Sequence, residues 1–114
     1  MAKTKKLFKN YNFTFDKNER KVLITFCKQV LKQLYGNPDH AKQAAIFDSI
    51  LKKLESGDEE IKLTKNETYV LSTSIKENVK FLGEKLKNSS FITKWFYKSV
   101  YKQYVNLLEK HFED

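Results

Sequence analysis

The sequence is poor in three residue types: its 114 residues include one cysteine, one proline and three glycines. The lone Cys27 excludes a disulfide within the chain and a zinc site built from several cysteines. Three separated glycines exclude a glycine-rich phosphate-binding loop. No apolar run reaches the roughly 18 residues of a membrane span, and no apolar stretch follows the basic residues 1–10 as in a signal peptide. We expect a cytoplasmic protein without a membrane segment.

Aromatic residues are plentiful by contrast, with nine Phe, six Tyr and one Trp. Disordered chains lack such side chains, and a chain of this length can bury one hydrophobic core. We therefore predict a single domain over residues 11–114, preceded by a flexible basic arm over residues 1–10.

The formal net charge of +8 is unevenly distributed. Residues 1–36 hold nine basic against two acidic side chains, residues 37–60 hold three against six, and residues 85–104 hold five against none. Such basic stretches favour an acidic partner, either a protein or a nucleic acid. Arg20, however, is the only arginine, and lysine cannot make the bidentate contacts by which arginine binds guanine or phosphate. This scarcity disfavours the nucleic-acid interpretation.

A short internal repeat organises the chain. Residues 13–23 read FTFDKNERKVL and residues 61–71 read IKLTKNETYVL, with Lys-Asn-Glu and Val-Leu identical at an offset of 48. Each copy begins with two apolar residues separated by one other residue, which predicts a short strand. Asp16 or Thr64 then stands three residues before a glutamate, the spacing of a helix-capping box. The repeat therefore predicts two strand-to-helix junctions.

Apolar residues at helical spacing follow each junction, and Gly, Asn, Pro and Ser interrupt them. We predict a mainly α fold, a four-helix bundle made of two strand-helix-helix halves (residues 13–57 and 61–112) that reflect an internal duplication. The strands, residues 12–15 and 60–63, should pair with each other because an isolated strand leaves its backbone groups unsatisfied. Asp39 is the expected cap of the second helix.

The predicted core is the apolar stripe of each helix. Its members are Val22, Leu23, Phe26, Cys27, Val30, Leu31 and Leu34 in the first helix, and Ala44, Phe47, Ile50, Leu51 and Leu54 in the second. The third contributes Leu71, Ile75, Val79, Leu82 and Leu86, and the fourth contributes Ile92, Phe96, Val100, Tyr104, Leu107, Leu108 and His111.

Side chains capable of catalysis or metal binding are few and scattered. Cys27 falls on an apolar stripe, so we expect a buried structural thiol rather than a nucleophile. His40 and His111 have no second ligand one turn away, as a metal site requires, and the acidic run at residues 58–60 lacks the ligand spacing of a calcium loop. We expect no catalytic, cofactor-binding or metal site, and we predict that the protein is not an enzyme.

The most unusual segment is the last helix, where residues 91–105 read FITKWFYKSVYKQYV. Opposite its apolar stripe, three lysines recur at every fourth residue and form a ridge. Aromatic side chains flank this ridge in greater number than one core face can hold. From this pattern we predict a partner-binding face made of six residues: Phe91, Lys94, Trp95, Lys98, Tyr101 and Lys102.

Three interpretations of this face are open. In the first, other elements cover the aromatic side chains and the lysines extend outward between them. In the second, the face binds a protein partner with an acidic surface, or a second copy of the chain. In the third, the lysines contact phosphates while the aromatic side chains stack on exposed bases.

We favour the second, a small non-enzymatic interaction or regulatory protein, such as an accessory or inhibitor protein of a mobile element. The alternative is a nucleic-acid-binding accessory protein that uses the same face and the N-terminal arm. An amphipathic membrane helix is disfavoured, because the core needs the apolar side of the last helix.

Overall fold

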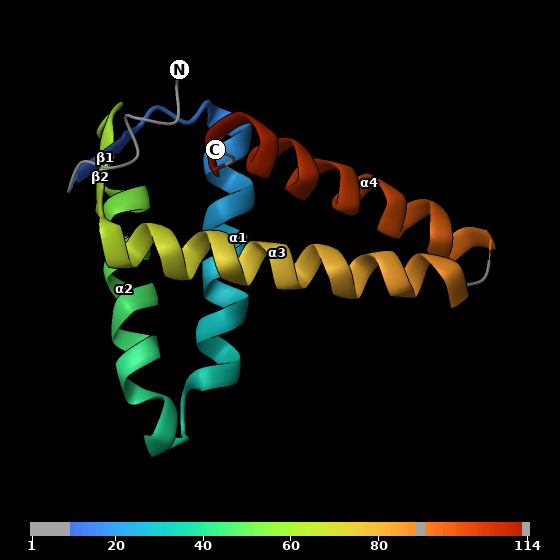
Figure 1. Ribbon diagram of the computed structural model, residues 1–114, viewed down its shortest axis with the longest axis horizontal. Helices are drawn as coiled ribbons and strands as arrows, with labels where there is room; N and C mark the ends of the chain where they lie inside the picture. The colour runs from blue at the N-terminus through green and yellow to red at the C-terminus, as the bar shows by residue number, and fades with distance from the viewer. Residues whose placement is uncertain (1–9, 89–90, 113–114) are drawn as a thin grey trace. The chain divides into compact units, whose positions relative to one another are not determined.

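The computed structural model describes residues 10–88 and 91–112, without the side chains of residues 10, 88, 91–93, 95 and 96. The chain divides into two compact units, whose boundary falls between Val70 and Leu71. The elements, in chain order, are β1 (Asn10–Phe13), α1 (Lys17–Leu34), the 3-10 turn η2 (Pro38–His40), α2 (Ala41–Glu55), β2 (Ile61–Thr64), α3 (Lys65–Asn88), α4 (Phe91–Leu107) and the π-helical turn η3 (Leu108–Phe112) (Figure 1).

Four α-helices and a small two-stranded antiparallel sheet confirm the predicted mainly α fold. Packing of the helices as a bundle, the single domain and the internal duplication stay predictions. Of the predicted N-terminal arm, residues 1–9 lie outside the described residues, and Asn10 is the first residue of β1. None of the helices in the described part of the chain combines the length and apolarity needed to cross a membrane.

Both predicted strand-to-helix junctions are confirmed, and each is a reciprocal capping box. The N–H of Glu19 donates to Oδ1 of Asp16 at 2.7 Å, and the N–H of Asp16 donates to Oε1 of Glu19 at 3.0 Å. Glu67 and Thr64 make the same two bonds, each at 3.0 Å. Because each box satisfies backbone donors at a helix start, α1 and α3 begin one residue after equivalent caps.

The predicted cap of the second helix is wrong. Asp39 lies inside the 3-10 turn η2, and Asn37 caps that turn: the Asn37 side chain accepts a hydrogen bond from the N–H of Asp39 at 3.0 Å. The helical path already begins at Pro38, because proline holds the φ angle of a first turn and lacks the N–H that would need a partner there. The resulting 3-10 turn leads into α2, whose N-terminus has no side-chain cap.

The predicted strand bounds, residues 12–15 and 60–63, are shifted from the observed ones. Phe13 lies opposite Ile61, and the ladder extends from this pair only toward Asn10 and Thr64. Beyond this pair, the carbonyl groups of Asp58 and Glu59 accept hydrogen bonds from Arg20, and the segment after β1 enters the capping box at Asp16. The predicted alternation of buried and exposed side chains is correct. Phe13 and Phe15 are both 5% exposed, although Phe15 lies after the end of β1.

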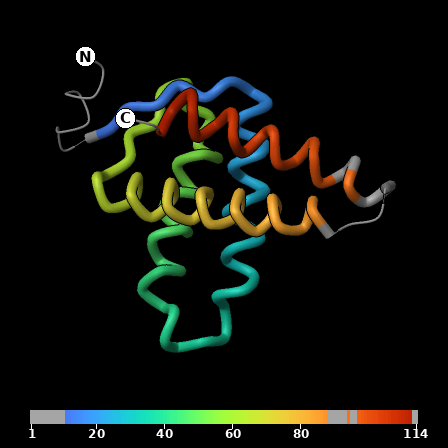
Figure 2. The backbone as a smooth tube through the Cα atoms, turned by 45° about the vertical axis from the view of Figure 1, so that its right-hand side comes forward, coloured from blue at the N-terminus to red at the C-terminus, as the bar shows by residue number. Residues whose placement is uncertain are grey.

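The first unit contains β1, β2, the hairpin of α1 and α2, and the first residues of α3. Figures 1 and 2 show α1 and α2 side by side. Phe26 of α1 meets Phe47 of α2 edge to face, with ring centroids 6.5 Å apart. The buried side chains follow the predicted stripes: Leu23, Phe26, Cys27 and Leu31 from α1, Phe47, Ile50 and Leu54 from α2, and Ile61 and Leu63 from β2.

The second unit comprises the remainder of α3, then α4 and η3. Its buried side chains are Leu71, Ile75, Leu82, Tyr104, Leu107, Leu108 and Phe112. Six of these seven were predicted core residues. Four other predicted core residues of this unit are only half-buried, namely Val79, Leu86, Val100 and His111. The last helical stretch ends in the π-helical turn, so α4 itself is shorter than the sequence pattern suggests.

Candidate functional site

A groove in the second unit gathers most of the predicted partner-binding residues. It has a volume of about 470 Å³. We call it the lysine groove; its described lining residues are Leu86 and Lys87 from the end of α3 and Lys94, Lys98, Tyr101 and Lys102 from α4.

The lysine groove exists because α4 runs back along the end of α3 (Figures 1 and 2). The two helices approach at Gly83 and Tyr101: a Cβ atom built at Gly83 would make an ordinary contact with Cε1 of Tyr101 at 3.6 Å. Three lysines spaced four residues apart on α4 share one face, with about 6 Å of helical rise between neighbours. Their ammonium groups therefore form a row along the groove rather than a scattered surface charge.

The lysine groove concentrates positive charge, since four of its described lining residues are lysines. All four are exposed, and none of them belongs to the Lys28–Glu55 or Lys53–Glu67 ion pair. Clustered like charges repel one another, and a bound anion relieves that repulsion. The apolar stems of the lysines lie beside Leu86 and the ring of Tyr101, so the groove combines apolar area with cationic heads.

The structure brings together four of the six predicted partner-binding residues, namely Lys94, Lys98, Tyr101 and Lys102. The side chains of Phe91 and Trp95 lie outside the described part of the structure. Leu86 also lines the groove, although the helical pattern predicts it as a core residue. The only sequence signal of this position is the interruption of the apolar pattern at residues 88–90, which places Leu86 near the end of a helix.

The predicted burial of Cys27 is confirmed. Its side chain is fully buried, and burial raises the pKa of the thiol to about 12. A thiol in this state is not a nucleophile at neutral pH. His40 is exposed and His111 is half-buried, and no cluster of three or more potential metal ligands occurs among the described residues.

The only arginine has a structural role. Arg20 donates from Nη1 to the carbonyl of Leu54 at 2.8 Å and from Nη2 to the carbonyl of Asp58 at 2.5 Å. Its planar guanidinium thereby joins α1 to the end of α2 and the following turn. This geometry uses the forked donors that would otherwise bind a phosphate or a base.

Glu67 is the one buried acidic residue of the described chain, at 7% exposure. Besides its capping bond to Thr64, it accepts from Oγ of Ser49 at 2.6 Å and from Nζ of Lys53 at 2.7 Å. Burial by itself raises the pKa of this carboxyl, but the hydrogen bonds and the charge of Lys53 outweigh burial and hold the pKa below its ordinary value. Glu67 is therefore ionised and fully engaged at neutral pH, as a structural group requires.

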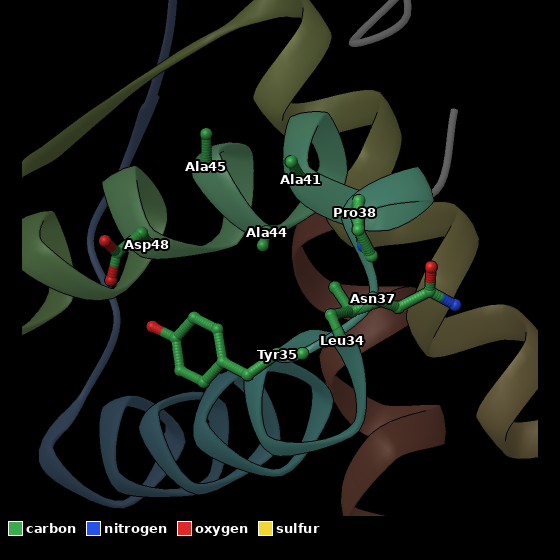
Figure 3. A pocket seen from close by; sticks show the side chains of 9 residues that line it. Leu34, Tyr35, Asn37, Pro38, Ala41, Ala44, Ala45 and Asp48 are labelled. Carbon is green, nitrogen blue, oxygen red and sulfur yellow. The ribbon is translucent and has the colours of Figure 1, made fainter.

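A second cavity, of about 520 Å³, lies at the tip of the α1–α2 hairpin. We call it the tip groove; its lining consists of residues 34–38 together with Ala41, Ala44, Ala45 and Asp48. Figure 3 shows the ring of Tyr35 extending between the two helices, with Ala44 above it and Asp48 at one end. No sequence pattern predicts this groove.

No family model, curated protein or solved structure matches this chain. The functional assignment therefore depends on the two grooves and their chemistry.

Proposed function

We propose that the protein is a non-enzymatic interaction or regulatory protein that binds an acidic protein partner through the lysine groove. The observation that carries this proposal is the convergence of Lys87, Lys94, Lys98 and Lys102 on one apolar-lined concavity. An exposed protein segment with several Asp or Glu side chains would neutralise the row of ammonium groups. An aliphatic or aromatic side chain of the same segment would contact Tyr101 and Leu86, and the burial of that side chain would supply affinity. In this proposal the protein acts in the cytoplasm.

The composition of the groove favours a protein partner over a nucleic acid. All of its cations are lysines, and the only arginine is engaged in holding the first unit together. Lysine supplies attraction without bidentate recognition. Carboxylates require no more than such attraction, whereas specific nucleic-acid recognition ordinarily uses arginine forks.

The proposal is tested by fluorescence anisotropy with three labelled probes. These are a short glutamate-rich peptide with one central phenylalanine, the same peptide with alanine in place of phenylalanine, and a single-stranded DNA of similar charge. We expect the phenylalanine peptide to bind most tightly, and Tyr101→Ala to remove its advantage over the alanine peptide. Equal or tighter binding of the DNA would instead establish the nucleic-acid alternative.

A charge-reversal variant, Lys94→Glu with Lys98→Glu, tests where the peptide binds. Binding should fall by at least about tenfold, since each reversed lysine replaces an attraction with a repulsion. The matched control reverses two exposed lysines of α1, Lys21 and Lys32, and so changes the net charge equally. If both double variants lose the same affinity, net charge rather than the lysine groove causes binding, and the proposal is wrong.

A further inference from the structure

The tip groove differs in chemistry from the lysine groove. The described residues that line it are apolar apart from Asn37, Asp48 and the hydroxyl group of Tyr35, and none of them is cationic. Asp48 makes no hydrogen bond or ion pair among the described residues, and its side chain is half-buried. A carboxylate in this position attracts a cation and repels the acidic segment that the lysine groove would bind.

The tip groove is open because small residues occupy one face of α2. Ala41, Ala44, Ala45 and Asp48 follow the i, i+3, i+4, i+7 spacing that places side chains on a single helical face. Further along the same helix, larger residues such as Phe47 and Ile50 fill the space against α1 and are fully buried. The alanines cannot fill the corresponding space at the tip, which leaves the cavity.

Tyr35 provides one wall of the tip groove. It is the C-terminal cap of α1, and 63% of its surface is exposed. The next residue, Gly36, has a φ of +90° that other residues adopt only with strain, and this fixed turn holds the aromatic ring beside α2 (Figure 3). An exposed tyrosine beside an apolar floor is typical of a binding surface, because the ring provides large contact area with few rotatable bonds.

We propose that the tip groove binds a segment of a partner protein that presents an arginine or lysine next to an apolar side chain. The apolar stem of the cationic residue would lie on the Tyr35 ring and the Ala44 methyl group, and its charged head would reach Asp48. The ring face adds a favourable interaction with the cation. The protein would thus carry two docking sites of opposite charge preference, one for an acidic segment and one for a basic segment.

The test titrates the full-length protein with three small probes that share one ring: benzylamine, benzyl alcohol and benzoate. Amide and methyl NMR shifts of Tyr35, Ala41 and Ala44 report occupancy. We expect benzylamine to bind at least about tenfold more tightly than benzoate, with benzyl alcohol between them. Equal or tighter binding of benzoate, or shifts confined to other residues, would overturn the proposal.

Two variants with matched controls assign the preference to the tip groove. Asp48→Asn should remove the advantage of benzylamine over benzyl alcohol, whereas Asp39→Asn, an exposed acid outside the lining, should preserve it. Ala44→Leu should fill the cavity and weaken all three probes, whereas Gln43→Leu on the exposed side of α2 should weaken none. Circular dichroism verifies that each variant is folded.

A second copy of the chain is the competing occupant. It predicts concentration-dependent association in sedimentation experiments that Ala44→Leu abolishes, and that result would contradict the proposal. The Lys94→Glu, Lys98→Glu variant should retain benzylamine binding. Failure of the lysine-groove proposal and failure of this one are therefore separate results.

Discussion

Nζ of Lys53 lies 2.7 Å from Oε1 of Glu67, the same carboxylate oxygen that accepts the capping hydrogen bond from the backbone of Thr64. One carboxylate thus starts α3 and links it to α2 through an ion pair. The equivalent glutamate of the other capping box, Glu19, makes its capping bonds at an exposed site. The two junctions share local structure but differ in tertiary contacts, and the difference is measurable.

Replacing the carboxylate with an amide, Glu67→Gln, should lower the free energy of unfolding at pH 7 by about 1 kcal/mol, a modest value because Lys53 is partly exposed. The folded-state pKa of Glu67 is lowered, so its stabilising effect is present above the ordinary glutamate pKa and is lost as the pH falls through the folded value. The difference between wild type and variant should therefore shrink between about pH 5 and pH 3. Urea denaturation at several pH values measures it.

Glu19→Gln is the matched control for this change. It alters the equivalent capping position. It should lower the free energy of unfolding at pH 7 by less than Glu67→Gln does, because the hydrogen bonds of Glu19 are exposed to solvent. A Glu67→Gln effect of the same size at pH 7 and pH 3 would show that the charge of Glu67 contributes nothing.

Arg20→Lys preserves the charge but removes the fork that reaches the carbonyls of Leu54 and Asp58. We expect a loss of about 1–2 kcal/mol in the free energy of unfolding, since a part-buried carbonyl loses a charge-assisted partner. Lys21→Ala at the neighbouring exposed position should change stability by less than about 0.5 kcal/mol. Equal urea midpoints for wild type and Arg20→Lys would contradict a structural role for the fork.

Cys27 should resist thiol reagents in the folded protein. Its thiol is fully buried with a pKa of about 12, so only about one molecule in ten thousand carries the thiolate at pH 8. Reaction with Ellman's reagent should be slow in buffer and rapid in denaturant, which serves as the control. A fast reaction in the folded state would contradict the structural assignment and restore the case for thiol chemistry.

The raised pKa of Cys27 also predicts how stability depends on alkaline pH. A raised folded-state pKa means that the stabilising effect of the protonated thiol is complete below the unfolded pKa and is lost as the pH rises above it. Wild type should therefore lose about 1.4 kcal/mol per pH unit above about pH 8.5 relative to Cys27→Ala. Parallel stability curves for the two proteins over this range would contradict the prediction.

Two glycine-to-alanine changes should have opposite effects on the free energy of unfolding. Gly36→Ala should cost about 1–2 kcal/mol, because the residue has a φ of +90° although no atom crowds a Cβ there. Gly83→Ala should raise the free energy of unfolding by about 0.5–1 kcal/mol through higher helix propensity. The new Cβ would make an ordinary contact with Tyr101 at 3.6 Å. Thermal denaturation of both variants measures the two effects on stability. Destabilisation by Gly83→Ala would mean that α3 and α4 cannot accommodate a methyl group between them.

The starts of α1 and α3 and most of the core could be predicted from the sequence because they depend on residues close together in the chain. Thr64 and Glu67 are one turn apart, and a capping box forms wherever that spacing precedes a helix. The burial of Cys27 followed from helical periodicity alone. The shifted strand bounds were not predictable in the same way, since strand pairing joins residues far apart in the chain, such as Phe13 and Ile61.

The same distinction between local and tertiary determinants applies to the two candidate sites. The sequence by itself determined that lysines and an aromatic residue share one face of the last helix, because helical geometry fixes which residues face the same side. Only the tertiary structure decided that this face meets Leu86 and Lys87 in a groove, and that Tyr35 and Asp48 border a second one. A cavity depends on which space neighbouring helices leave unfilled, and that space is a property of their packing rather than of either helix alone.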